Sequence, residues 1–147
     1  MELKKLTAAD RPAIRSLFLD VFSNAPWNDD WSDEAQLNAY LDDLTGNRNS
    51  LSLGFFDGER LIGLALGNIR HWFRGTEYYI DELCVARSLQ GRGIGTAFLA
   101  EIERYLSARH IPRIFLQTER TVPAYSFYRK RGFTELPDHV SLFKAWD

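Results

Sequence analysis

A glycine-rich stretch, Gln90–Thr96, is the part of the sequence whose residue types and spacing point most directly to chemistry. It stands between residues 78–85, which are rich in β-branched and aromatic side chains, and residues 96–106, which have helical spacing. A turn from a strand into a helix exposes the first backbone N–H groups of that helix, and glycine allows positive φ angles there. These N–H groups and the positive end of the helix dipole favour a bound phosphate. We therefore predict a phosphate-binding turn.

Two common phosphate-binding patterns do not fit this turn. The nucleoside-triphosphate pattern requires a lysine before its Ser or Thr, but Gly95 is followed directly by Thr96. The dinucleotide pattern requires glycine at position 96 and a long alternating chain after it. The spacing of Gln90, Gly93 and Gly95 instead resembles the pyrophosphate-binding motif of the GNAT N-acetyltransferase superfamily. The resemblance implies that acetyl-coenzyme A is held here, by Gln90, Gly91, Arg92, Gly93, Ile94, Gly95 and Thr96.

A second motif, in residues 124–133, is similar to a later motif of the same superfamily. In that motif a tyrosine faces the thioester sulfur, so the resemblance implies that Tyr128 assists the departing thiolate and that Lys130 contacts the coenzyme. Proton transfer from a tyrosine of pKa about 10 to a thiol of pKa about 8.5 is uphill by about 2 kcal/mol, so we expect a hydrogen bond. The alternative is that Tyr128 packs in the core, although Tyr125 and Phe127 are better candidates for packing.

Two adjacent acids, Asp81 and Glu82, stand on the predicted strand before the glycine turn. An alkylamine of pKa about 10.4 is almost fully protonated at pH 7, so a base or a water chain must remove a proton before the amine can attack a thioester. Because side chains alternate across a strand, we expect only one of the two acids to face the cleft. We favour Asp81 as the base or amine-orienting group, with Tyr79 on the same face. The alternatives are Glu82 or water, and Glu82 could instead form a salt bridge across the sheet.

The resemblance also implies a role for the end of this strand. Backbone N–H groups around Leu83, Cys84 and Val85 would stabilise the negative charge that builds on the thioester oxygen, at a place where the sheet splays open. Cys84 raises the alternative that a thiol takes the acetyl group first. No histidine in the neighbouring motif could activate that thiol, so we expect a buried structural cysteine and direct transfer.

The charge distribution favours two different ligands. The net charge is only −2, but every charged residue between Arg15 and Arg48 is acidic, whereas basic residues predominate over residues 87–131. A polyanionic coenzyme at the basic part and a cationic amine at the acidic part are both favoured. Aromatic side chains near the acids could bind a cation, or could instead close the edge of the core. The expected acceptor-binding residues are Trp27, Asp30, Trp31, Trp72 and Tyr79.

The order of predicted elements is that of the superfamily, β-α-α-β-β-β-α-β-α-β-β. We therefore expect an α/β (α+β) GNAT fold with a mixed central sheet of about seven strands flanked by four helices. Thr7, Ser32 and Pro123 begin three of the helices, and the fourth follows the glycine turn. Asp57-Gly58 predicts a hairpin, and the strand 113–117 should be central. The expected strands are 3–6, 51–56, 61–70, 78–85, 113–117, 133–136 and 141–146.

Composition limits the remaining possibilities. A chain of 147 residues with 45% hydrophobic content fits one N-acetyltransferase domain over residues 1–147. A single cysteine excludes internal disulfides, and no apolar run reaches the roughly 18 residues of a membrane span, so we expect a cytoplasmic protein without a membrane partner. The three histidines lack ligand spacing and the net charge is negative, so we expect no metal and no nucleic acid.

The sequence thus predicts direct transfer of an acetyl group from acetyl-coenzyme A to a primary amine in a ternary complex. The expected acceptor is a small cationic amine, either aminoglycoside-like or a polyamine. The alternatives are a peptide N-terminus or a lysine side chain, or a non-catalytic module that senses acyl-coenzyme A. A homodimer is possible, as is common in the superfamily.

Overall fold

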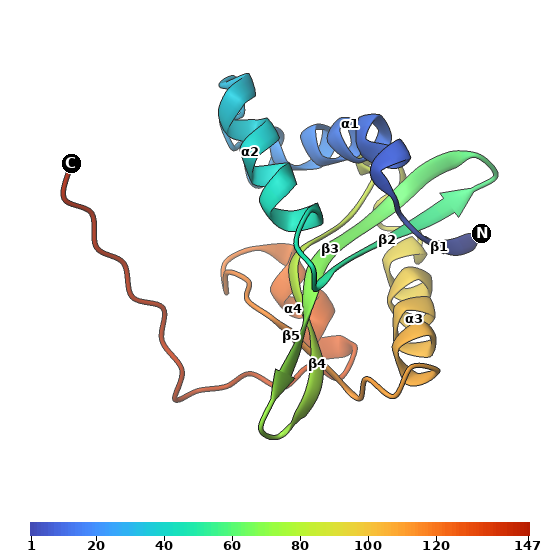
Figure 1. The fold of residues 1–147 in the computed structure, drawn as a ribbon, viewed down its shortest axis with the longest axis vertical. Helices are drawn as coiled ribbons and strands as arrows, with labels where there is room; N and C mark the ends of the chain where they lie inside the picture. Colours follow the sequence, from blue (N-terminus) through green and yellow to red (C-terminus); the bar gives the residue numbers. More distant parts are fainter. The chain divides into compact units, whose positions relative to one another are not determined.

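The computed structural model describes residues 1–147 and divides them into two compact units, residues 1–117 and 118–147. The first unit contains one five-stranded sheet in the order β1-β2-β3-β4-β5 (Figure 1). Neighbouring strands are antiparallel except β4 and β5, which are parallel, so the sheet is mixed as predicted. The strands are β1 (Glu2–Lys5), β2 (Ser50–Asp57), β3 (Arg60–Trp72), β4 (Gly75–Val85) and β5 (Arg113–Leu116).

Helices cover both faces of this sheet (Figure 1). Helices α1 (Arg11–Phe22) and α2 (Glu34–Thr45) form one hydrophobic core with Leu64 and Leu66 of β3. Helix α3 (Ile94–Ser107) forms a second core that includes Ala65, the residue between them. Because adjacent side chains of a strand point to opposite faces, the two cores lie on opposite sides of the sheet.

Local signals predicted the first half of the chain well. The Thr7 backbone N–H donates to the Asp10 carboxylate at 2.8 Å, in the short 3-10 turn Ala8–Asp10 that leads into α1. The cap of α2 is Asp33 and not Ser32, because the Asp33 carboxylate accepts the Gln36 N–H at 3.1 Å. The apolar residues of α1 recur at helical spacing, and all of them on the sheet-facing side are buried: Ile14, Leu17, Phe18, Val21 and Phe22.

The prediction of seven strands is wrong in the C-terminal part. Helix α4 (Pro123–Lys130) forms, and Gly132 follows it with φ +91°, but residues 133–136 and 141–146 form no strands. Strand β5, expected to be central, is instead the last strand of the sheet. A strand forms only where it pairs with a neighbouring strand, and neither of these two segments does so.

None of the helices combines the length and the apolar character needed to cross a membrane.

Candidate functional site

The glycine turn has the backbone conformation that we predicted. Gly91 and Gly93 have φ angles of +77° and +79°, and a Cβ added at either position would meet nothing within 4 Å. These two glycines are therefore needed for their backbone angles and not for close packing. Gly95 differs, because it lies in the first turn of α3, which begins at Ile94. The start of α3 presents N–H groups beside an open surface, which suits an anionic ligand.

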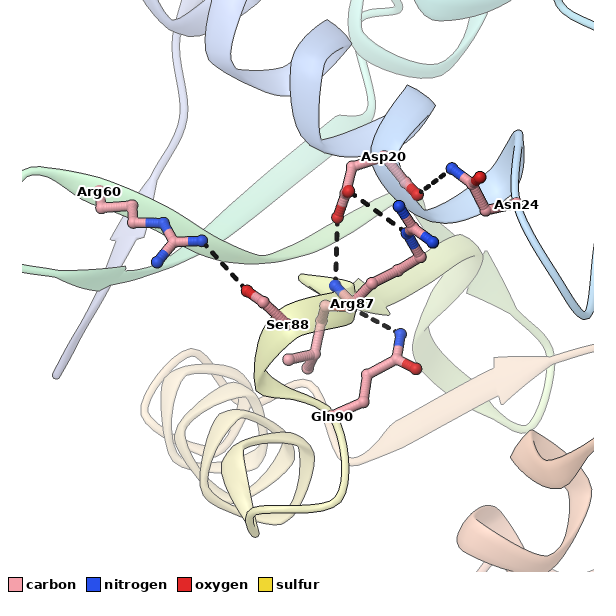
Figure 2. A network of polar contacts seen from close by, with 7 residues as sticks. Asp20, Asn24, Arg60, Arg87, Ser88 and Gln90 are labelled. Carbon is pink, nitrogen blue, oxygen red and sulfur yellow. Dashed lines mark hydrogen bonds and ion pairs between the residues drawn. The ribbon is translucent and has the colours of Figure 1, made fainter.

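A polar network holds the segment that precedes this turn (Figure 2). The Asp20 carboxylate of α1 accepts a hydrogen bond from the Arg87 backbone N–H at 3.1 Å and another from Arg87 Nε at 3.4 Å. The Gln90 side chain donates to the Val85 carbonyl at 3.0 Å, so it braces the turn against β4. Sequence reasoning missed Asp20, since no local signal connects residues 67 positions apart.

The last residues of β4 have one edge that does not pair with β5. The β4–β5 ladder runs only from Glu77 to Ile80 of β4, so Leu83 and Val85 do not pair with β5. On the other edge the Ala86 N–H donates to the Ile62 carbonyl of β3 at 2.8 Å. Since N–H directions alternate along an antiparallel strand, the N–H groups of Leu83 and Val85 point away from β3, toward the open edge. They are suitably placed to bind a carbonyl oxygen there.

Cys84 lies between these two residues and faces the core. Its side chain is buried, as predicted. Burial raises the pKa of its thiol, and the negative charges of Glu82 and Asp20 raise it further. A thiol kept protonated is a poor nucleophile, so Cys84 is not arranged to take an acetyl group.

A β-bulge interrupts the alternation of β4 at the acid pair. Leu66 of β3 pairs with Glu82 and Gly67 pairs with Ile80, so Asp81 is the extra residue. A Cβ on Gly67 would lie 2.1 Å from the Tyr79 carbonyl oxygen, so only glycine fits opposite the bulge.

Because of this bulge, both acids lie on the α1–α2 face of the sheet. The Asp81 carboxylate accepts a hydrogen bond from Asn68 of β3 at 3.4 Å, and the Glu82 carboxylate accepts one from Tyr40 of α2 at 2.6 Å. The alternation that we expected for these two side chains therefore does not hold at the bulge. Glu82 is hydrogen-bonded to the phenol of Tyr40, whereas the alternative of a salt bridge required a basic side chain.

The two carboxylates have different environments. Burial raises the pKa of Glu82 to about 7, the Tyr40 hydrogen bond opposes this rise, and the charges of Asp81 and Asp29 add to it. Burial also raises the pKa of Asp81, while Arg70 and the hydrogen bond from Asn68 lower it. A carboxylate with a pKa near 7 can accept a proton at neutral pH without a large energetic cost.

Tyr40 was not predicted to belong to this site. Its ring stacks on Trp31 with centroids 5.2 Å apart and planes at 13°. Burial raises the pKa of Tyr40, as do its hydrogen bond to Glu82 and the charge of Glu82, so the phenol stays protonated and donates to the carboxylate. The contact joins residues 42 positions apart, and no local pattern could have revealed it.

The loop residues expected to bind the acceptor have several different surroundings. Trp27 is half-buried and packs against Phe22 with ring centroids 5.8 Å apart, and Trp31 packs between α1 and α2. Both tryptophans thus contribute to the edge of the core. The Trp31 Nε1 atom is buried without a hydrogen-bond partner. Asp30 is exposed, and hydrogen bonds from Ser32 lower the pKa of its carboxyl group.

The strand residues expected to bind the acceptor also differ. The Tyr79 ring stacks on Phe115 at 5.1 Å, and the Arg70 guanidinium lies 3.9 Å from the same ring, so little aromatic surface remains for a cationic ligand. Trp72 is at the tip of the β3–β4 hairpin, opposite Gly75. At about 3.3 Å per residue, the tip is on the order of 20 Å along β4 from the acid pair, so the structure does not bring Trp72 to the acids.

The second unit contains Tyr128, the buried residue of α4, with 9% of its surface exposed. Its ring packs against Phe133 with centroids 5.2 Å apart. We expected Tyr125 and Phe127 to pack instead, but both are only partly buried, and the Tyr125 hydroxyl donates to Glu135 at 2.9 Å. Lys130 is exposed.

No three His, Cys, Asp or Glu side chains come together as a possible metal site.

Comparison with protein families gives one match. The model described as the acetyltransferase (GNAT) family matches residues 11–133. No curated protein matches the chain.

Solved structures with the same fold include two aminoglycoside acetyltransferases. One is from an uncultured soil metagenomic sample in complex with sisomicin, with 18% identity, a TM-score of 0.75, and coverage of 99% of this chain and 96% of that chain. The other is aminoglycoside 6'-N-acetyltransferase from Acinetobacter haemolyticus, with 18% identity, a TM-score of 0.73 and full coverage of both chains. A transcriptional regulator from Bacillus halodurans has 16% identity, a TM-score of 0.74 and coverage of 99% of both chains. At identities this low, the structural similarity shows a shared fold alone.

Proposed function

Because the chain belongs to the GNAT acetyltransferase family, we propose that it transfers an acetyl group from acetyl-coenzyme A directly to a primary amine in a ternary complex. Members of this family use acetyl-coenzyme A, which supplies the acetyl group as a thioester. The family match runs across the boundary between the two units at residue 117, which supports the assignment of residues 1–147 to one acetyltransferase domain.

The single observation that carries this proposal is the position of Glu82. Its carboxylate is partly buried, has a pKa raised to about 7, and accepts a hydrogen bond from Tyr40 at 2.6 Å. It is one residue before Leu83, whose N–H group points to the open edge of β4. We assign Glu82 as the base that accepts the proton of the amine, in place of the Asp81 that the sequence favoured. Asp81 then acts through its charge, which helps to keep the pKa of Glu82 high.

Backbone groups supply the remaining interactions with the coenzyme. The N–H groups of the glycine turn and of the first turn of α3 would bind the phosphates, with Arg92 and Thr96 close by. The N–H groups of Leu83 and Val85 would bind the carbonyl oxygen of the acetyl group. The family resemblance supports Tyr128 as the hydrogen-bond donor to the departing sulfur and Lys130 as a coenzyme contact.

The acceptor in this proposal is a small cationic amine, either aminoglycoside-like or a polyamine. Two features support it. Asp29 and Asp81 place negative charge around the base, since both act on the pKa of Glu82. In addition, the fold is shared with two aminoglycoside acetyltransferases, one of them crystallised with sisomicin.

A panel assay tests the proposal. The protein is incubated with acetyl-coenzyme A and one amine at a time, and both free thiol release and the mass of the product are measured. The panel contains sisomicin, spermidine, a peptide with a free N-terminus and a peptide with an internal lysine. We expect turnover with the first two. Turnover with the peptides alone would show that the acceptor is a peptide amine and not a small cationic amine. Coenzyme binding without any turnover would support a non-catalytic sensor.

A further inference from the structure

The glycine turn lies in open surroundings, so its position is set by the segments on either side of it. A Cβ added at Gly91 or Gly93 would meet nothing within 4 Å. Helix α3 begins at Ile94 and holds the glycine turn from one side. On the other side, a short 3-10 turn, Arg87–Leu89, leads into Gln90. The contacts of this 3-10 turn therefore help to decide where the N–H groups of the glycine turn lie.

Two apolar residues anchor the 3-10 turn in the interior. Ala86, just before it, belongs to the core on the α1–α2 side, and its N–H donates to the Ile62 carbonyl at 2.8 Å. Leu89, its last residue, packs against both hydrophobic cores. Apolar contacts are not directional, so they fix the depth of the 3-10 turn better than its orientation. Its orientation depends on a directional contact.

Asp20 of α1 supplies a directional contact (Figure 2). The first N–H group of a helical turn has no partner within the turn, and Ala86, at the cap position, makes no side-chain hydrogen bond. The Asp20 carboxylate takes that role from a different element. One of its oxygens accepts the Arg87 backbone N–H at 3.1 Å, and the other accepts Arg87 Nε at 3.4 Å. These two contacts together hold the carboxylate in one orientation.

The contact between the two side chains contributes little as an ion pair. The side chains of Asp20 and Arg87 are 39% and 49% exposed, and pairs as exposed as these add little to stability. The hydrogen bond to the Arg87 backbone N–H is different, because a main-chain donor cannot swing away as a side chain can. It joins α1 directly to the segment that leads into the glycine turn.

We propose that Asp20 is a positioning residue for the coenzyme, because it caps the 3-10 turn Arg87–Leu89 through the Arg87 backbone N–H. The inference rests on the proposed function, in which the glycine turn binds acetyl-coenzyme A. Without the cap, the glycine turn takes more than one position, and the coenzyme binds only one of them, which weakens the apparent affinity. We expect a loss of about fivefold in affinity, which corresponds to the roughly 1 kcal/mol that a helix cap contributes.

Calorimetry with acetyl-coenzyme A tests the proposal on three variants. Asp20→Ala removes the cap and should raise the Kd about fivefold. Asp20→Asn keeps an oxygen that can accept the Arg87 N–H, so it should restore most of the affinity. Arg87→Ala removes the guanidinium but keeps the backbone N–H, so its Kd should stay close to that of the parent. In steady-state kinetics, Asp20→Ala should raise the KM for acetyl-coenzyme A and leave kcat unchanged, since the acid pair is intact.

Asp42→Ala is the matched control, because it removes the acid of another exposed ion pair of α1, in which Arg11 lies 2.8 Å from Asp42 of α2. It should keep the affinity of the parent. An unchanged Kd in Asp20→Ala, an equal loss in Asp42→Ala, or a loss in Arg87→Ala as large as that in Asp20→Ala would overturn this inference alone. A parent that binds no acetyl-coenzyme A would overturn the proposed function and this inference together.

Discussion

The glycine turn and the acid pair of β4 are two neighbouring regions of the molecule that are built in opposite ways. The turn uses backbone groups: Gly91 and Gly93 hold positive φ angles in open surroundings. The acid pair depends on side chains from three elements, because Glu82 of β4 is held by Tyr40 of α2 and Asp81 by Asn68 of β3. One region is defined by a few consecutive residues, and the other by contacts between distant ones.

This difference teaches how each region can fail. A backbone site tolerates many side chains but not a change of φ angle, whereas a buried carboxylate tolerates backbone adjustment but not the loss of its partner or its charge. Substitutions in the two regions should therefore affect different measurements. Acid-pair variants should change the rate and its pH dependence, and turn variants should change coenzyme affinity.

The largest expected effect is that of Glu82→Gln on the rate. Loss of a general base typically costs about 100- to 10,000-fold, so kcat should fall by at least about 100-fold while the Kd for acetyl-coenzyme A stays the same. Asp81→Asn is the matched control, and we expect a loss of less than about tenfold. Steady-state kinetics on both variants measures this. A larger loss in Asp81→Asn than in Glu82→Gln would make Asp81 the base.

The next effect is on stability and requires no substrate. The pKa of Glu82 is about 7 in the folded chain against a usual 4.5, so the folded state binds the proton more tightly. Its contribution to stability is therefore complete below about pH 4.5 and is lost as pH rises to about 7, by at most about 3 kcal/mol. The free energy of unfolding in urea is measured at pH 5 and at pH 8 for both proteins. Its decrease between the two pH values should be larger in the parent than in Glu82→Gln, by about that amount. Parallel pH dependences would show that Glu82 is not desolvated.

An intermediate effect is expected from Gly93→Ala. The αL conformation costs a residue with a Cβ about 1–2 kcal/mol, and relaxation of the turn would weaken acetyl-coenzyme A binding by about 5- to 30-fold. Calorimetry measures this affinity. Gly58→Ala is the matched control, because Gly58 also has a positive φ angle, +60°, and open space around it, but lies in the β2–β3 hairpin. Gly58→Ala should lose similar stability but keep its affinity for acetyl-coenzyme A. Equal losses of affinity in the two variants would show that the glycine turn does not bind the coenzyme.

The smallest effect is that of Tyr40→Phe on the pH profile. The Tyr40 hydrogen bond lowers the pKa of Glu82, so its removal should raise that pKa above about 7. Less of the carboxylate is then ionised at pH 7, and kcat should fall a few-fold there and recover at higher pH. Tyr105→Phe on α3 should leave the midpoint unchanged. A Tyr40→Phe profile with a lower midpoint would contradict this account of Glu82.

The sequence predicted those parts of the molecule that depend on neighbouring residues. The glycine turn, the hairpin at Gly58 and the buried face of α1 all follow from spacings of a few positions. The contact between Tyr40 and Glu82 could not be predicted, because it depends on how α2 packs against β4. The bulge at Asp81 was also missed, since it depends on Gly67 in the opposite strand. The two C-terminal strands were predicted wrongly for a related reason: a strand needs a paired neighbour, and the residues of a segment do not supply one.

The extra residue in β4 also bears on how this enzyme could diverge. Glu82 already pairs with Leu66 and Ile80 with Gly67, so loss of Asp81 would join two residues that already face opposite sides of the sheet. The rest of β4 would keep its register with β3, and the Tyr78 hydroxyl would keep its hydrogen bond to the Leu51 carbonyl. A single-codon deletion is thus enough to remove one of the two acids while the strand on either side keeps its pairing.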